Sequence, residues 1–485
     1  MQRILFFLFL FGFQFSYAQV FETVLADVDD MQLSTDMIEV DDGYIVSVLE
    51  RNTYWRLKII KINKAGIEVA RVQYPERVIA AEASLTVLSD TSFLLNYLSR
   101  SEGDSVRCIY RVLNNHLEEI IYREVDPEIS FTGALYCFSR TSLMSSGNIV
   151  HSFNFYSLSD NGEFPFYLVK TDMQLTEASI KMHTFPKKGT ALVQLGSAIS
   201  YMESDTLLLL FNWEIACKVA PDLSIADTIS RSFYIFQGQN VTYITWAPSS
   251  QWLSDGSLIA GGGVARTIAV AKYNPDLSKN NFVSIDPNVT DIQSPYFEPL
   301  SVYNDQIFIG CTMDWLFGIN PYFGHIKDAY PRLYKLNADL EIIWEMDYHK
   351  DNGYHYYIQN ILATSDGGCL LASTRSNLST QGERVDLYLM KVNGNGQLGI
   401  QEEPVQSEVK VYPNPGRTEF TVSVEHFTPG SIFSLYDLSG RCVMHQRLSE
   451  TAEIIDVSFL PSGVYIYEVY NKESIQGRGK WIKVE

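Results

Sequence analysis

The stretch SDGSLIAGGGVARTIAVAKYNPDL, residues 254–277, joins two short phrases that recur through most of the chain. The first phrase, here SDGSLIAGG, is a tight polar turn that leads into an apolar run. The second, here IAVAKYNPDL, is an apolar run followed by Lys, then Asn or Asp, then Gly or Leu. Gly and small polar residues permit tight turns, and short apolar runs between turns are typical of strands. The stretch therefore predicts the two middle strands of a small antiparallel unit.

Both phrases recur at a regular interval. The basic residue of the second phrase returns about every 50 to 60 residues, at Lys61, Arg111, Lys170, Lys218, Lys272, Lys335 and Lys391, with the copy at Arg111 the weakest. A copy of the turn phrase precedes each, starting at residues 41, 89, 145, 204, 254, 303 and 365. Four short strands per repeat are the pattern of a propeller blade, whose faces are buried only against neighbouring blades.

We therefore expect an all-β chain in which a seven-bladed β-propeller spans residues 19–396. An open stack of the same sheets, or a ring of six or eight blades, is the alternative. The recurring Lys and Asn or Asp predict a turn motif rather than a ring of ligands, because Asn and Asp tolerate left-handed turns and Lys protects exposed strand ends. The phrases resemble the degenerate repeats of secreted bacterial propellers with DGG and K-x-D-x-x-G turns, which implies an architecture but no function.

The first eighteen residues, MQRILFFLFLFGFQFSYA, have the parts of a secretory signal peptide. Arg3 gives a positive start, residues 4–15 form an apolar core, and residues 16–18 make a small-x-small cleavage site. We expect cleavage between Ala18 and Gln19. The apolar core is too short for a mature membrane-spanning helix, and no later apolar run approaches that length, so we expect no transmembrane segment in the mature chain.

The 485 residues carry a formal net charge of -20 at pH 7, with a pI of about 4.8. Binding of nucleic acid needs a basic surface, so we expect no nucleic-acid partner and attribute the acidity to solubility. The six cysteines show no metal-binding or redox spacing, and those at 108, 217 and 369 fall inside apolar strand patterns. They are interpreted as buried thiols, while one or two disulfides stay open for an exported protein.

A second unit follows a polar, acidic linker at 397–407. Residues 408–485 contain seven short segments of alternating apolar and polar residues, separated by Gly, Pro, Ser and Asn turns. This pattern predicts a small immunoglobulin-like β-sandwich. Its opening VYPNP, at 411–415, places two prolines directly after the first strand, which they end.

Four motifs of this unit, in order, resemble the C-terminal sorting domain of the type IX (Por) secretion system. They are Tyr412-Pro413-Asn414-Pro415, LYDLSGR with Gly440, LPSGVY with Gly463 and Tyr465, and KWIKV beginning at Lys480. The resemblance implies an export address that the outer-membrane secretion machinery of a Gram-negative cell recognises after periplasmic folding. It also implies that the domain is commonly removed, and that the rest is secreted or attached to surface lipopolysaccharide. The alternative is an ordinary immunoglobulin-like accessory domain.

Linear motifs for catalysis are absent. The chain has no HExxH, GxSxG, P-loop or calcium loop, so we predict no catalytic, cofactor-binding or metal-binding residue. His349 and His355 lie near Asp347 and Asp351, but no regular helix aligns them as metal ligands.

Two function classes are left open: a binding or interaction propeller, and a hydrolase or lyase that acts on polysaccharide or peptide. The central channel discriminates between them. Two buried carboxylates at glycosidase separation favour the enzyme, and aromatic and neutral polar groups favour binding.

The sixth repeat is the longest, and its additional residues lie in TMDWLFGINPYFGHIKDAYPRLY, residues 312–334. Aromatic residues interrupted by Gly and Pro predict a loop there, with Trp315, Tyr322, Phe323 and Tyr330 as candidate binding residues for a glycan or peptide. The next inter-repeat connection is expected to add Tyr354, Tyr356 and Tyr357. The alternative is that these rings cover a blade edge or pack between blades.

Overall fold

The computed structural model describes residues 20–25, 31–51, 54–100, 105–129, 136–156, 163–186, 195–201, 204–211, 215–229, 249–264, 267–285, 292–293, 299–314, 329–350, 352–377, 385–398, 409–424, 431–437, 441–470 and 475–484. Every regular element within these residues is a β-strand, so the expected all-β fold is confirmed. The chain divides into two compact units, unit 1 at Met1–Gly399 and unit 2 at Ile400–Glu485.

The described residues of unit 1 form seven antiparallel sheets, called blades 1 to 7 in chain order. Blade 1 consists of β2 (Met31–Val40), β3 (Gly43–Arg51), β4 (Trp55–Asn63) and β5 (Glu68–Gln73). Blade 2 consists of β6 (Val78–Ser89), β7 (Ser92–Arg100), β8 (Val106–Asn114) and β9 (Glu119–Val125). Blade 3 consists of β10 (Tyr136–Leu143), β11 (Ile149–Tyr156), β12 (Glu163–Thr171) and β13 (Ala178–Pro186).

Blades 4 to 6 continue the same order, and blade 6 has one additional short strand. Blade 4 consists of β14 (Leu195–Ser200), β15 (Leu207–Phe211), β16 (Ile215–Val219) and β17 (Ile225–Ile229). Blade 5 consists of β18 (Ser249–Trp252), β19 (Leu258–Val264), β20 (Thr267–Tyr273) and β21 (Lys279–Ile285). Blade 6 consists of β22 (Ile292–Gln293), β23 (Leu300–Tyr303), β24 (Gln306–Met313), β25 (Tyr330–Leu336) and β26 (Ile342–Asp347).

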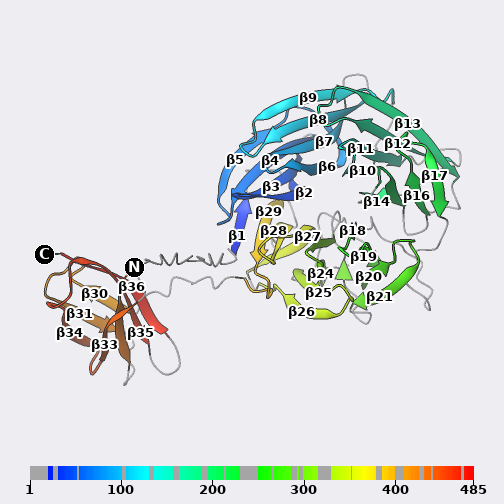
Figure 1. The fold of residues 1–485 in the computed structure, drawn as a ribbon. Helices are drawn as coiled ribbons and strands as arrows, with labels where there is room; N and C mark the ends of the chain where they lie inside the picture. Colours follow the sequence, from blue (N-terminus) through cyan, green and yellow to red (C-terminus); the bar gives the residue numbers. More distant parts are fainter. Residues whose placement is uncertain are drawn as a thin grey trace, which may run out of the picture. The chain divides into compact units, whose positions relative to one another are not determined.

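Blade 7 takes its fourth strand from the other end of unit 1. Strands β27 (Tyr354–Ala363), β28 (Cys369–Asn377) and β29 (Val385–Val392) are completed by β1 (Phe21–Leu25). Strand β1 pairs antiparallel with β29, from Phe21 opposite Lys391 to Leu25 opposite Leu387. The N-terminal strand therefore closes a ring of blades, which Figure 1 shows for unit 1.

The first strands of successive blades contact one another around the whole ring, and β27 of blade 7 contacts β2 of blade 1. Side-chain hydrogen bonds cross every junction: Leu85 N to Asp36 Oδ2 (2.7 Å), Thr141 Oγ1 to Asn96 Oδ1 (2.8 Å), Ser142 Oγ to Ala198 O (2.8 Å), Trp252 Nε1 to Ser200 O (2.8 Å), Ser249 Oγ to Leu300 O (3.0 Å), Ala363 N to Ser301 Oγ (2.9 Å) and Asn360 Nδ2 to Ser34 O (2.9 Å). Each bond contributes about 1 kcal/mol. The expected propeller is confirmed, and its described residues form seven blades.

Apolar side chains fill the space between neighbouring blades, as the repeat requires. Between blades 1 and 2, for example, Ile45 and Leu57 lie in one buried cluster with Leu95 and Phe93, all of them inaccessible to solvent. Burying side chains of this size stabilises the fold by about 1.5–3 kcal/mol each. Because both faces of the inner part of each sheet are covered in this way, strands such as β3, β4 and β7 read as near-continuous apolar runs, whereas outer strands such as β5 alternate.

The turn between the third and fourth strands corrects one expectation. Its left-handed residue is not the Asn or Asp; it is the residue at the fourth position, Gly66, Leu117, Leu175, Leu223, Leu277, Leu340 or Gly396. The leucines are buried, and their burial offsets the steric cost of that backbone. The Asn acts through its side chain: Asn337 Oδ1 accepts hydrogen bonds from the N–H groups of Asp339 and Glu341 at 3.0 and 2.9 Å.

The recurring Lys at the end of the third strand is buried in four blades and half-buried at Lys170 and Lys218, so the expectation that it protects an exposed strand end is wrong. The buried copies are Lys61, Lys272, Lys335 and Lys391. Lys61 Nζ donates to Asp42 Oδ2 at 2.8 Å and to Asn115 O, in the next blade, at 2.7 Å. Lys272 donates to Ala338 O at 3.1 Å in the same way. Lys61, Lys272 and Lys335 therefore each link a blade to a turn of its neighbour, whereas the partners of Lys391 lie within blade 7.

Unit 2 is a sandwich of a three-stranded and a four-stranded sheet. Its strands are β30 (Val409–Tyr412), β31 (Glu419–Val424) and β34 (Ala452–Asp456) in the first sheet, and β33 (Cys442–Arg447), β32 (Ile432–Tyr436), β35 (Gly463–Tyr470) and β36 (Ile475–Lys483) in the second. Phe420, Phe433 and Trp481 lie at the centre of its buried core. The expected immunoglobulin-like β-sandwich is confirmed.

Candidate functional site

The YPNP segment of unit 2 is joined to the closing strand. Asn414 Nδ2 donates to Lys480 O at 2.6 Å, and Asn414 Oδ1 accepts from Ile482 N at 3.0 Å. Trp481 is fully buried and donates its ring N–H to Pro413 O at 3.0 Å. Hydrogen bonds therefore join the first sorting motif to the last, and the side-chain amide of Asn414 uses both its donor and its acceptor in them.

The other sorting-motif residues divide between core and surface. Tyr465 is buried, its hydroxyl donates to Pro461 O at 2.7 Å, and its ring lies 6.0 Å from that of Trp481. Gly440 lies outside the described residues. The exposed motif residues are Tyr412, Pro413, Asn414, Pro415, Gly463 and Lys480. Some residues of these motifs therefore stabilise the fold of unit 2, while others lie on its surface.

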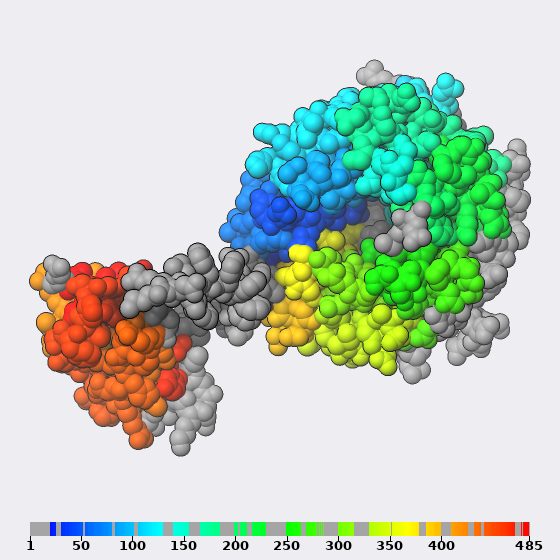
Figure 2. All heavy atoms as spheres, in the orientation of Figure 1, coloured from blue at the N-terminus to red at the C-terminus, as the bar shows by residue number. Residues whose placement is uncertain are grey.

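A cavity opens at one end of unit 1. This end, called the turn face, carries the turns between the first and second strands and between the third and fourth strands of the blades. The cavity has a volume of about 530 Å³ and is lined by residues of blades 5, 6, 7, 1 and 2. Small-molecule sites have volumes of roughly 300–1,000 Å³. Figure 2 shows that unit 1 is hollowed at the middle of its ring.

The cavity wall combines apolar and neutral polar side chains. Val40, Val87 and Val302 contribute apolar surface, and Ser92 and Gln251 contribute neutral polar groups. Val87 is 47% exposed although it lies on an inner strand, which places part of its side chain against open space. The lining therefore suits a ligand with an apolar body and a few polar groups.

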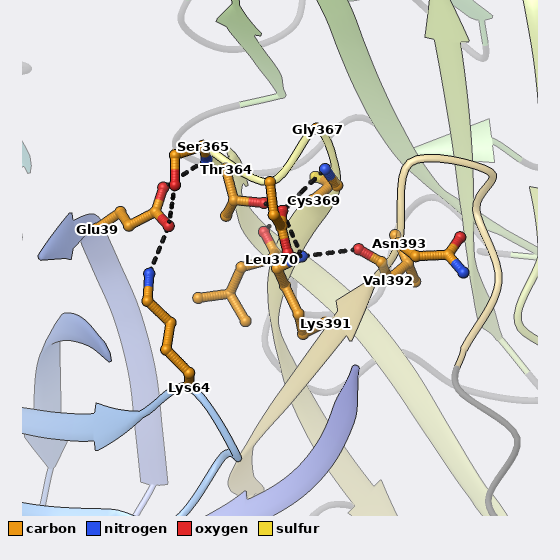
Figure 3. A network of polar contacts seen from close by, with 12 residues as sticks. Glu39, Lys64, Thr364, Ser365, Gly367, Cys369, Leu370, Lys391, Val392 and Asn393 are labelled. Carbon is orange, nitrogen blue, oxygen red and sulfur yellow. Dashed lines mark hydrogen bonds and ion pairs between the residues drawn. The ribbon is translucent and has the colours of Figure 1, made fainter. Parts of the chain in front are cut away.

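Glu39 is the most strongly engaged carboxylate of the lining (Figure 3). Its Oε1 accepts from Lys64 Nζ at 2.5 Å and from Ser365 Oγ at 2.8 Å, and its Oε2 accepts from Ser365 N at 2.6 Å. Because Glu39 belongs to blade 1 and Ser365 to blade 7, these bonds also hold the ring closed. With both oxygens occupied, Glu39 is poorly placed to act as a general base.

Asp41 and Asp90 are the remaining carboxylates of the lining, and both are exposed. Each is the first residue of a two-residue hairpin turn, one in blade 1 and one in blade 2. No cationic side chain among the described residues pairs with either carboxylate. The adjacent Asp42 differs, because its hydrogen bond from Lys61 holds the pKa of that carboxyl below its usual value.

The aromatic loop predicted in blade 6 lies mostly outside the described residues, which include Tyr330 but not Trp315, Tyr322 or Phe323. Tyr330 is half-buried at the start of β25, and its ring meets that of His349 edge-on at 5.0 Å. Burial raises the pKa of the Tyr330 hydroxyl. The binding role of this loop stays a prediction.

The three tyrosines assigned to the next connection are not in a connection. Tyr354, Tyr356 and Tyr357 belong to inner strand β27, and the last two are buried. Tyr354 is half-buried and lies under the guanidinium of Arg375 at 4.4 Å from the ring centroid. The expectation is wrong because the aromatic run continues directly into the apolar inner strand, where β-branched and aromatic residues pack well.

The histidines of the same region do not gather as metal ligands. Asp347 forms a two-point ion pair with Arg332, and His355 is buried against Ser376. Across the part of the chain that the structure describes, no group of three or more His, Cys, Asp or Glu side chains is arranged to hold a metal ion. Among those same residues, no helix is long and apolar enough to cross a membrane.

The cysteines at 108, 217 and 369 are buried free thiols, as interpreted from the sequence, and so is Cys311. Burial raises the pKa of the Cys217 and Cys369 thiols to about 12, which leaves them as unreactive thiols at neutral pH. They contribute packing rather than chemistry.

Sequence reasoning expected a central channel but did not identify the residues of the turn-face cavity, because its lining comes from turns far apart in the chain. Asp41 and Asp42 stand together at a turn in the sequence, and the structure shows that Asp42 is the one that pairs with Lys61. The other is left for the cavity. Nothing in the sequence marked Glu39 as the partner of Ser365, 326 residues away.

Comparison with known proteins agrees with the geometry of unit 2. Residues 410–484 match a family model described as "Secretion system C-terminal sorting domain". No curated protein matches the chain. One solved structure, titled "Crystal structure of BBS1N in complex with ARL6DN, soaked with mercury", has 9% sequence identity and a TM-score of 0.40, and covers 78% of this chain and 98% of that chain. Similarity at that level says nothing about the function of this chain.

Unit 2 thus carries an export module. The chain is a protein with a type IX (Por) secretion system C-terminal sorting domain, as the four motifs predicted. Such a domain supports export to the cell surface or into the medium, and it implies contact with the secretion machinery.

Proposed function

We propose that the protein is an exported binding propeller that takes up a small ligand in the turn-face cavity. The sorting domain delivers it through the periplasm and across the outer membrane of a Gram-negative cell. Its parts are a signal peptide at 1–18, a propeller at 19–396, a linker at 397–407 and a sorting domain at 408–485. Within this proposed linker, Gln397 N–H donates to Asn393 of the last turn of blade 7, and Leu398 packs against the apolar cluster of blades 6 and 7.

One observation supports binding over catalysis. The cavity has the volume of a small-molecule site, yet its one half-buried carboxylate, Glu39, is bonded on both oxygens. Among the described residues, the lining therefore lacks the pair of buried, unengaged carboxylates that a glycosidase needs. The neutral polar residues that share the wall suit ligand recognition. A hydrolase or lyase is the weaker alternative, and the aromatic loop around Trp315, Tyr322 and Phe323 is a second candidate contact surface.

The test fills the cavity without touching the core. Val87→Trp places an indole into the space from a side chain that is 47% exposed, and the control Val69→Trp adds the same ring to outer strand β5, where Val69 is 54% exposed. The mature protein and both variants are titrated calorimetrically with a fixed panel of neutral oligosaccharides, short peptides and amines.

We expect at least one panel member to bind, with about tenfold weaker affinity in Val87→Trp, or about 1.4 kcal/mol. The control should bind as the wild type does. Equal binding by all three proteins would move the site away from the turn face, and a panel without any binder would refute the proposed function.

A further inference from the structure

The turn-face cavity has an unbalanced charge. Its lining contains three carboxylates, Glu39, Asp41 and Asp90, and a single ammonium group, Lys64. Lys64 pairs with Glu39 at 2.5 Å, and it also lies 4.5 Å from the centroid of the Tyr44 ring. Among the described residues Lys64 pairs with Glu39 and with neither Asp41 nor Asp90, so two negative charges of the wall have no cationic partner there.

We propose that the cavity binds a small organic cation, an aliphatic amine whose ammonium group is recognised by Asp41 and Asp90. This proposal rests on the proposed binding function and adds the chemistry of the ligand. The two aspartates occupy equivalent turn positions in neighbouring blades, each flanked by a cross-strand pair, Val40 with Gly43 and Ser89 with Ser92. The repeat thus presents two carboxylates to one space from two adjacent turns.

The charge selects against other ligands. An anion would meet two uncompensated carboxylates, inside a chain whose formal net charge is -20. Like charges brought together at a binding surface are repelled, and opposite charges are attracted before contact. A neutral sugar would leave the two carboxylates without a counter-charge once the cavity is filled. An ammonium group supplies that charge and donates up to three hydrogen bonds.

The apolar wall selects an organic cation over a metal ion. Val40, Val87, Val302 and Leu362 offer contact to a hydrocarbon chain and no ligand to a metal. Within the described residues, no cluster of three metal-ligating side chains lies on this wall. Tyr303, also on the lining, is 37% exposed and adds an aromatic surface to the cavity wall. An amine on a hydrocarbon chain matches both parts of the wall, because its ammonium group pairs with the carboxylates and its chain contacts the apolar side chains.

Two sources supply this chemistry: a free diamine, and the side chain of a lysine-containing peptide. The first arm of the experiment titrates the mature protein with cadaverine and with the dipeptide Lys-Lys. 1,5-Pentanediol serves as the neutral isostere of the diamine. We expect an amine to bind with an affinity that falls with added salt, and the diol to bind at least about tenfold more weakly. The stronger of the two amines identifies the source.

The second arm removes the charge. Asp41→Asn and Asp90→Asn together should weaken amine binding about tenfold or more. The control Asp339→Asn removes an exposed carboxylate from another turn of the same face, outside the cavity lining, and should leave binding unchanged.

Failure of the ligand assignment differs from failure of the site. If the diol or an oligosaccharide binds as well as the amine, and the double variant binds it equally, the cation assignment is overturned while the cavity stays a binding site. If Val87→Trp also has no effect on any ligand, the proposed function fails as well.

Discussion

Substitution of Lys391 by Met tests whether the buried lysines stabilise the propeller. Lys391 is fully buried, and its ammonium group donates to both oxygens of Asp366, at 3.0 and 2.9 Å, and to Val392 O at 2.9 Å (Figure 3). Methionine has a similar length but no charge. The substitution therefore leaves Asp366 without its counter-charge and Val392 O without this donor.

The expected loss of stability depends on the hydrogen bonds that Asp366 still accepts in the Lys391→Met variant. Breaking a buried ion pair by removing one partner costs about 3–5 kcal/mol. Asp366 still accepts hydrogen bonds from Thr364 Oγ1 at 2.6 Å and Gly368 N at 3.0 Å, and its side chain is 17% exposed. The lower end of the range, about 3 kcal/mol, therefore applies. A unit of this size has an unfolding entropy of about 0.8 kcal/mol/K, so the Tm should fall by about 4 °C.

The dependence on pH separates lost charge pairing from lost packing. Burial alone would raise the pKa of Asp366, but hydrogen bonds from Thr364 and Lys391 outweigh it and hold the pKa below its usual value. That contribution is present above the ordinary pKa of an aspartate and is lost as pH falls through the folded pKa. Lys391→Met should therefore destabilise more at pH 7 than at about pH 2.5, below the ordinary pKa of an aspartate.

The assay is chemical and thermal unfolding of the mature protein at both pH values, with Asp366→Asn and the double variant completing a cycle. The double variant should be less destabilised than the sum of the single variants, by about 1–2 kcal/mol. Additive losses, or a Tm for Lys391→Met within 1 °C of wild type, would refute the view that this ion pair stabilises blade 7.

Four further predictions concern other parts of the chain. Trp481→Ala removes a fully buried ring at 4.8 Å from that of Phe420, and it should destabilise unit 2 by about 3–5 kcal/mol while the propeller transition stays in place, as calorimetry would measure. Burial lowers the pKa of His151 to about 3, so between about pH 6.5 and 3 the unfolded state binds a proton at this histidine and the folded state does not. The wild type therefore loses stability as the pH falls through that interval, and His151→Leu should lose less, as urea titrations would measure. N-terminal sequencing of exported protein should begin at Gln19, and finding the uncleaved terminus would contradict the signal-peptide assignment. Deletion of 408–485 should trap a folded propeller in the periplasm, and normal surface delivery of that truncation would contradict the export role.

The sequence predicted what depends on local pattern. The turn phrases located the second strands, and the Lys phrases located the ends of the third strands, because each phrase contains its own turn chemistry and apolar period. The role of the lysine was mistaken, since burial of Lys61 depends on Asn115 in the next blade, which no local pattern contains. The left-handed leucines were missed for the same reason: burial against a neighbouring blade outweighs an intrinsic preference for Gly or Asn.

The candidate site was less accessible to such reasoning. Motifs identified the sorting domain, because its residues lie within about 75 positions of one another and follow a fixed order. The turn-face cavity brings Glu39 and Ser365 together from opposite ends of unit 1, and its two unpaired aspartates differ from other turn aspartates only by what surrounds them. Position in the ring, rather than residue type, gives Asp41 and Asp90 their chemistry.

Closure of the ring explains why the position of a residue in the ring matters more for the cavity than its residue type. The repeat count alone leaves blade 7 one strand short, because a polar segment follows β29 where a fourth strand would stand. Strand β1 supplies it, and Asn360 with Ser34 and Ser365 with Glu39 then join blade 7 to blade 1. These contacts join residues from opposite ends of unit 1 in the sequence, so forming them carries the loop-closure cost of a non-local contact. The same step assembles the cavity wall, since Ser365 and Leu362 reach Glu39 and Val40 only across the closed junction. If the proposed ligand binds at the turn face, its binding is therefore coupled to closure of the propeller, and a ligand that contacted both blade 7 and blade 1 would stabilise the junction that completes the ring.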